Sequence, residues 1–188
     1  MSVIVVGIMG NKGSGKGTIA NRFVQKGYIE LSFANAVKKA VSNIFSWPFE
    51  MLKGDTEESR LFRETEDFWW SEKLEKRITP RIILQQFATD IMRNKFDQNI
   101  WLLTVEREIY NYEKLGQRKF VISDLRFENE HSWIKSFSNN KIISVSRPNK
   151  IDCDNHESET SWISLERDYD LINDSTIEEL YSKVDEII

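Results

Sequence analysis

The chain has 188 residues, of which 40% are hydrophobic and 30% are charged, and its formal net charge is −4 with an isoelectric point near 5.4. This length and hydrophobic content exclude a disordered protein and allow one sizeable core. The acidic balance argues against a non-specific nucleic-acid-binding protein, and a single cysteine, Cys153, excludes an intramolecular disulfide. No apolar stretch has the length of a membrane span or a signal peptide, so we expect a cytoplasmic protein.

The first elements alternate between strand and helix. Residues 3–6 form a continuous apolar run, which is typical of a strand buried on both faces of a parallel sheet. A glycine-rich stretch follows at residues 7–17, and residues 18–25 read as a helix that ends at Gly27. We then expect a strand at residues 28–33 and a helix at residues 34–45.

The middle of the chain is predicted to be helical throughout. Residues 46–78 are charged and aromatic without a strand pattern, which favours an inserted helical subdomain that acts as a lid or acceptor-binding region. Thr79 and Pro80 have the residue types of an N-cap and a first helical position, and they predict a helix at residues 81–94. A further helix is expected at residues 100–115.

The last third returns to alternating strands and helices. Strands are expected at residues 120–124, 141–146 and 171–173, with helices at residues 128–137 and 175–187. This order predicts an α/β fold with a mostly parallel central sheet. We therefore expect residues 1–188 to form a single domain that carries the insertion at residues 46–78.

The glycine-rich stretch has the composition of a phosphate-binding loop. Its sequence from residue 10 to residue 18 is GNKGSGKGT, and a strand precedes it and a helix follows. Such a loop points successive backbone N–H groups at an anion, and the helix adds the positive end of its dipole. Its lysine, Lys16, is expected to reach the β- and γ-phosphates of a nucleotide. The sequence therefore predicts an ATP-dependent phosphotransferase.

The residue after the loop lysine narrows the class of phosphotransferase that the sequence predicts. The usual loop has a serine or threonine there as a magnesium ligand, whereas this chain has Gly17 followed by Thr18. The form resembles nucleoside monophosphate kinases such as adenylate kinase. We therefore expect Mg²⁺ to be held through water, with Asp124 nearby, rather than by a loop hydroxyl.

Asp124 and Arg126 form the second half of the predicted site. They follow a core strand at its carboxyl end, where open α/β sheets bind ligands. A carboxylate at that position can hold Mg²⁺ through water, and an arginine can clamp phosphate oxygens. An ion pair between these two residues is the alternative interpretation.

Several segments together resemble the deoxynucleoside monophosphate kinases of tailed bacteriophages and large DNA viruses. They are FANAVK at residues 33–38, RIILQQFATD at 81–90, FD at 96–97 with Trp101, DLRFENE at 124–130, RP at 147–148 and HESE at 156–159. Two positions depart from the family pattern, since Ala88 replaces a glycine and Gly17 replaces an acidic residue. The resemblance implies a three-layer P-loop NTPase fold, ATP with Mg²⁺ and a deoxynucleoside monophosphate (dNMP) as ligands, and a homodimer.

The resemblance also implies a division of roles among the site residues. Lys16, Arg126, Asp124 and Arg81 would be the catalytic residues. ATP would be bound by Gly13, Ser14, Gly15, Lys16, Gly17, Thr18 and Arg147. The dNMP would be bound by Lys12, Phe33, Ala34, Lys38, Arg63, Arg81, Gln85, Ala88, Thr89 and Trp101.

Some of these assignments have alternatives in the sequence. Arg60 lies three residues before Arg63 and is a substitute for it, Trp101 is equally typical of a core residue, and Arg147 has a capping or solvated role as its alternative. Gln85 and Thr89 are one helical turn apart, so both can face a nucleobase, or both can be ordinary helix surface.

Two other functions fit the same loop. One is a kinase of another small phosphorylated acceptor, such as phosphomevalonate. The other is a regulatory P-loop ATPase, which the small, acidic chain without a separate recognition module disfavours. The sequence leaves the preferred nucleobase open.

Overall fold

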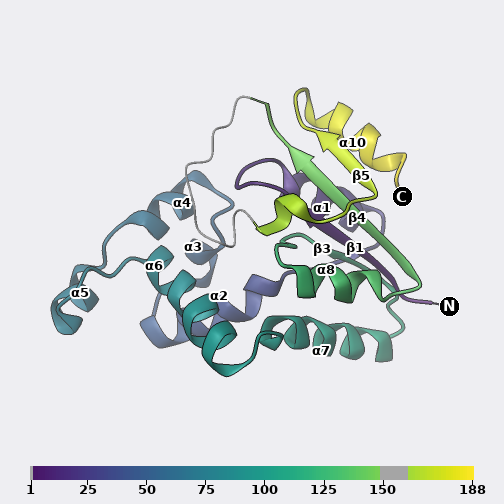
Figure 1. Ribbon diagram of the computed structural model, residues 1–188. Helices are drawn as coiled ribbons and strands as arrows, with labels where there is room; N and C mark the ends of the chain where they lie inside the picture. Colours follow the sequence, from purple (N-terminus) through teal and green to yellow (C-terminus); the bar gives the residue numbers. More distant parts are fainter. Residues whose placement is uncertain (1, 149–160) are drawn as a thin grey trace. The chain divides into compact units, whose positions relative to one another are not determined.

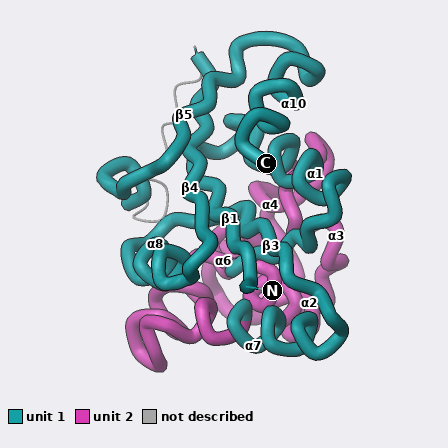
Figure 2. Tube along the Cα trace, turned by 90° about the vertical axis from the view of Figure 1, so that its right-hand side faces the viewer, with its two compact units in different colours: residues 1–33, 105–188 teal, residues 34–104 magenta. Residues whose placement is uncertain are grey.

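The structure is a computed structural model that describes residues 2–148 and 161–188. It contains two compact units (Figure 2), and the second is inserted into the first. Unit 1 comprises Met1–Phe33 and Val105–Ile188, and unit 2 comprises Ala34–Thr104. The segment predicted as an insertion, residues 46–78, lies inside unit 2, and its role as a lid stays a prediction.

Unit 1 is built on a five-stranded sheet in the order β2-β3-β1-β4-β5. Its strands are β1 (Ile4–Met9), β2 (Ile29–Leu31), β3 (Lys119–Ile122), β4 (Asn139–Ser146) and β5 (Tyr169–Ile172). Each pairing between described strands is parallel, which confirms the prediction of a mostly parallel sheet. Because β1 is the central strand, it is paired on both edges and is almost completely buried.

Helices cover both faces of this sheet (Figure 1). Val6 and Ile8 of β1 face the same side, because side chains alternate along a strand. They belong to a core cluster that includes residues of α1 (Lys16–Gln25) and α10 (Ile177–Asp185). Gly7 faces the other side, where Ile134 of α8 (Glu128–Lys135) is its nearest neighbour. The result is a three-layer α/β/α arrangement, as the sequence predicted.

Unit 2 is helical, and two helices connect it to unit 1. The connecting helices are α2 (Phe33–Phe45) and α7 (Ile100–Lys114). Between them lie α3 (Phe49–Lys53), α4 (Glu57–Glu64), α5 (Phe68–Leu74), α6 (Pro80–Gln85) and the π-helix η1 (Gln86–Phe96). A short 3-10 helix, η2 (Ser161–Ser164), precedes β5 in unit 1. Aromatic side chains organise unit 2, since Trp47 and Trp70 both contact the ring of Phe45.

The helix predicted at residues 81–94 differs from the observed structure. It begins as expected, with the Thr79 hydroxyl accepting a hydrogen bond from the Ile82 N–H and Pro80 in the first position. From Gln86 onward the backbone forms a π-helix instead of continuing as an α-helix. A π-helix has i→i+5 hydrogen bonds and often occurs at functional sites.

Candidate functional site

The predicted phosphate loop folds as a tight turn between β1 and α1. Gly10, Gly13 and Gly15 all have positive φ angles, of 147°, 72° and 115°. A Cβ atom on Gly10 would lie 2.2 Å from the Val145 carbonyl oxygen of β4. Only glycine therefore allows the loop to leave the sheet here.

Lys16 closes the loop from the first turn of α1. Its Nζ donates hydrogen bonds to the carbonyl oxygens of Gly10, at 2.7 Å, and Asn11, at 2.8 Å. The ammonium group thus lies across the opening of the loop, where the sequence places the β- and γ-phosphates of a nucleotide. Gly17 is exposed and nothing lies within 4 Å of a Cβ built on it, so packing does not explain the glycine at that position.

Ser14 lies at the bottom of the loop. Its side chain is only 2% exposed, and its hydroxyl makes no hydrogen bond to any residue in the described ranges 2–148 and 161–188. Its carbonyl oxygen accepts a hydrogen bond of 2.8 Å from the Asn173 side chain, which follows β5. A buried polar group normally has a partner, so the Ser14 hydroxyl is unusual among the described residues.

Asp124 joins the carboxyl ends of β3 and β2. One of its oxygens accepts a hydrogen bond from the Ser32 hydroxyl at 2.8 Å, and the other accepts from the Phe33 N–H at 2.9 Å. These two contacts orient the carboxylate. Asp124 therefore has a fixed position at the carboxyl ends of two neighbouring strands.

Arg126 lies in the turn between β3 and α8. Its backbone N–H donates to the Glu130 carboxylate at 3.0 Å, and the Phe127 N–H donates to the same oxygen at 3.1 Å. Glu130 is 2% exposed and lies in the first turn of α8, where its carboxylate accepts from the backbone N–H of the N-cap residue, Phe127. The turn that carries Arg126 is therefore anchored to the helix that follows it.

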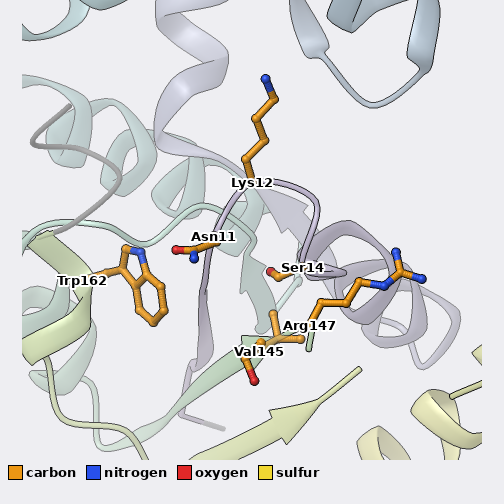
Figure 3. Close-up of a pocket in the computed structure, with 7 residues that line it drawn as sticks. Asn11, Lys12, Ser14, Val145, Arg147 and Trp162 are labelled. Atoms are coloured by element: carbon orange, nitrogen blue, oxygen red, sulfur yellow. The ribbon is translucent and has the colours of Figure 1, made fainter. Parts of the chain in front are cut away.

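A pocket of about 60 Å³ adjoins the loop (Figure 3). Its lining comes from the loop, the end of β4 and η2, and consists of Asn11, Lys12, Ser14, Val145, Ser146, Arg147 and Trp162. In Figure 3 the Trp162 indole lies on the Asn11 side, whereas Arg147 extends away from Ser14 on the other side. An aromatic ring and a guanidinium beside a phosphate loop can both stack on a planar base.

Unit 2 carries most of the residues that the sequence assigns to the acceptor, all except Lys12 and Phe33. Arg81 is the second residue of α6 and forms an ion pair with Glu64 of α4, through Nε and Oε1. Gln85, the last residue of α6, is half-buried, and Thr89 of the π-helix is buried. The sequence predicted that Gln85 and Thr89 lie one α-helical turn apart and face the same way. Gln85 instead ends an α-helix and Thr89 belongs to the π-helix, so α-helical spacing does not describe their relative direction.

Trp101 has a structural contact within unit 2. Its indole N–H donates to the Ala88 carbonyl oxygen at 3.0 Å, and the side chain is 7% exposed. This contact ties α7 to the π-helix and agrees with the core alternative for Trp101. Ala34 and Lys38 are half-buried on α2.

The predicted residues thus form two groups. The structure brings the loop, Asp124, Arg126 and Arg147 together at the carboxyl ends of the strands of unit 1, with Lys12 and Phe33 in the same unit. Unit 2 holds the group Ala34, Lys38, Arg63, Arg81, Gln85, Ala88, Thr89 and Trp101. Cys153 and the segment 156–159 lie outside the described residues.

Four residues in contact with the candidate site or close to it in the chain were not predicted from the sequence as site residues. They are Glu64, Arg93, Trp162 and Asn173. Arg93 is a cation that is only 8% exposed on the π-helix, four residues after Thr89. Asn173 had a usable signal, because it is a polar residue at the carboxyl end of a predicted strand.

Two further properties of the described residues are the capacity to bind a metal ion and the capacity to cross a membrane. No three His, Cys, Asp or Glu side chains among them gather in a way that could hold a metal ion. None of the described helices is both long and apolar enough to cross a membrane.

Comparison with known proteins identifies the family. Residues 53–184 match the family model described as deoxynucleotide monophosphate kinase. A protein of Acanthamoeba polyphaga mimivirus, provisionally named a deoxynucleotide monophosphate kinase, is 35% identical over 97% of this chain and 94% of its own length. The deoxynucleotide monophosphate kinase of Enterobacteria phage T4 is 25% identical over 59% of this chain, a segment that spans 46% of the phage enzyme.

The solved structures show a related fold. TT1252 from Thermus thermophilus aligns with a TM-score of 0.50 and 19% identity, over 100% of this chain and 97% of that one. This likeness concerns the fold alone. The family match, in contrast, covers residues 53–184, which is more than half of the chain and includes the strand-end residues Asp124 and Arg126. The chain therefore belongs to the deoxynucleotide monophosphate kinase family of phosphotransferases.

Proposed function

We propose that this chain transfers the γ-phosphoryl group of ATP to a dNMP and produces ADP and a deoxynucleoside diphosphate. An oxygen of the acceptor monophosphate forms a bond to the γ-phosphorus, and the bond from that phosphorus to the β–γ bridging oxygen breaks. The nucleophile is already anionic, so no general base is needed. The observation that carries the proposal is the Lys16 ammonium across the loop opening, in a chain of this family.

The donor side of the reaction rests on the loop. Its backbone N–H groups and Lys16 would bind the ATP phosphates, and Lys16 would follow the charge that develops on the transferred group. The Ser14 hydroxyl, buried without a described partner, supports a ligand at this position. Arg126 would clamp phosphate oxygens from the end of β3, and Arg147 would stack on the adenine.

The residues present fit Mg²⁺ bound together with ATP. Oxygen ligands and retained water suit this cation, and Asp124 offers an oriented carboxylate. Asp124 would hold the ion through water, since Gly17 replaces the usual hydroxyl. When bound, Mg²⁺ supplies charge neutralisation to the β- and γ-phosphates.

The acceptor side of the proposal rests on unit 2. Arg63 and Arg81 would bind the monophosphate, and Gln85 and Thr89 would contact the base. Thr89 lies within the π-helix and is buried, so it is not part of an ordinary helix surface, and π-helices often occur at functional sites. The remaining members of the proposed acceptor set are Lys12 and Phe33 in unit 1 and Ala34, Lys38, Ala88 and Trp101 in unit 2.

Assembly and compartment complete the proposal. We propose a homodimer, as the resemblance to the phage enzymes implies, and activity in the cytoplasm of the host cell, where ATP and dNMPs are available. Light scattering on the purified chain measures the assembly directly.

An acceptor panel tests the proposed reaction. ATP and Mg²⁺ are incubated with each dNMP, with the corresponding ribonucleotides and with phosphomevalonate, and the products are identified by chromatography. We expect a deoxynucleoside diphosphate from at least one dNMP. Turnover of phosphomevalonate alone, or ATP hydrolysis without any phosphorylated product, would refute the proposal.

A further inference from the structure

The guanidinium of Arg81 is held by a carboxylate of the same unit. Arg81 Nε donates to Oε1 of Glu64, the last residue of α4. The Arg81 side chain is 14% exposed and that of Glu64 is 50% exposed, so the arginine is largely enclosed while the carboxylate is open to solvent. An ion pair of this kind adds little to stability. Its effect on the orientation of Arg81 is therefore the more important one.

The atom that Glu64 contacts determines what the pair does. A guanidinium is planar and presents its donors in a fixed fork. A carboxylate bound at Nε fixes the rotation of that plane and so sets the direction in which both Nη atoms point. Phosphate recognition by arginine is bidentate and depends on this direction.

The same helix end supports the other arginine of the predicted acceptor site. Arg63 precedes Glu64, and its guanidinium lies against Gly54, which ends α3 with a φ of 75°. A Cβ atom on Gly54 would lie 2.2 Å from Arg63 Nη1. The last turn of α4 thus carries Arg63 itself and the carboxylate that holds Arg81.

We propose that Glu64 is a positioning residue for the acceptor site and holds the Arg81 fork in the orientation that receives the acceptor monophosphate. The proposal rests on the proposed function and deepens it. In the opposite role, Glu64 would compete with the substrate phosphate for Arg81. Removal of the Glu64 carboxylate would then lower the KM for the dNMP rather than raise it. The observed contact is at Nε, and a carboxylate bound there can set the plane of the guanidinium, which is what the positioning role requires.

Two substitutions at Glu64 separate the effect of its hydrogen bond to Arg81 from the effect of its negative charge. Glu64→Ala removes the contact, and we expect the KM for the dNMP to rise about tenfold, which is the effect of about 1.4 kcal/mol. Glu64→Gln keeps an oxygen that accepts from Nε, so its KM should lie between those of Glu64→Ala and the wild type. The KM for ATP should stay unchanged in both variants, because Arg81 is assigned to the acceptor.

The chain offers a matched control in the ion pair between Glu66 and Arg77. It lies in the same unit, with N and O atoms 3.6 Å apart and Arg77 66% exposed. Glu66→Ala removes a carboxylate of unit 2 without touching Arg81, so both KM values should remain at the wild-type level. An unchanged or lower dNMP KM in Glu64→Ala, or an equal rise in Glu66→Ala, would overturn the positioning role.

A double-mutant cycle tests whether Glu64 acts through Arg81. In the presence of Arg81→Lys, which lacks the planar fork, the substitution Glu64→Ala should have little further effect on dNMP binding by calorimetry. Purely additive effects would contradict the inference. Failure of the proposed function is distinguishable, because then the wild-type protein itself phosphorylates no dNMP in the acceptor panel.

Discussion

Replacement of Lys16 by alanine tests the phosphate loop most directly. In the structure the Lys16 ammonium donates to two carbonyl oxygens of the loop, at 2.7 and 2.8 Å. With a nucleotide bound, the same group is expected to contact the β- and γ-phosphates. The substitution therefore removes two hydrogen bonds that support the loop and a cation that is expected to act in the transition state.

The two effects have different sizes. Two intramolecular hydrogen bonds contribute about 1–3 kcal/mol together. For a chain of this length such a loss lowers Tm by several degrees, at about 2–4 °C per kcal/mol, and leaves the protein folded at 25 °C. Loss of a group that stabilises transition-state charge commonly lowers kcat by about 10²-fold or more, which corresponds to at least ~2.7 kcal/mol.

The assay compares kcat for the best dNMP with Tm and circular dichroism on the same preparations. Lys26→Ala is the matched control, because Lys26 caps the other end of α1 and pairs with Asp185 at 3.2 Å, away from the loop. We expect kcat to collapse in Lys16→Ala and to persist in Lys26→Ala. A folded Lys16→Ala protein with near-wild-type kcat would refute the role assigned to Lys16.

Three further predictions concern the rest of the chain. Arg81→Lys keeps the charge but loses the fork, so calorimetry should show weaker dNMP binding and unchanged ATP binding; the reverse would move Arg81 to the donor site. Hydrogen exchange in residues 46–78 should slow when dNMP and an ATP analogue bind together, and unchanged protection at saturation would contradict a lid. Hydrogen bonding by Arg22 lowers the pKa of Asp185 to about 2. A lowered carboxylate pKa stabilises the fold above its unfolded-state pKa near 4, so the difference in Tm between wild type and Asp185→Asn should shrink from pH 4 toward pH 2; a constant difference would contradict this.

The sheet and the loop were predictable because their signals are local. The apolar run of residues 3–6 became part of the central strand β1, and Gly10, Gly13 and Gly15 adopt the positive φ angles that a phosphate loop requires. Asp124 was found by its place after a predicted strand, since the carboxyl ends of parallel strands meet at one edge. These inferences need only the order of residues along the chain and the rules of parallel sheets.

The remaining features depend on contacts between distant residues. The residues of the π-helix have ordinary helical composition, and burial of Thr89 and Arg93 is a tertiary property that spacing does not report. Glu64 is one of many glutamates in a charged segment, and only the fold brings it to Arg81. Trp162 reached the pocket in the same way, through the packing of η2 beside the loop.

The position of unit 2 in the chain has a consequence for how such enzymes diversify. It occupies the connection between β2 and β3, which are neighbouring parallel strands. Parallel neighbours always require a long crossover, so the chain has to leave the sheet and return at this point. Natural variation can therefore exchange or enlarge that crossover while the strands that flank the phosphate loop keep their order and register.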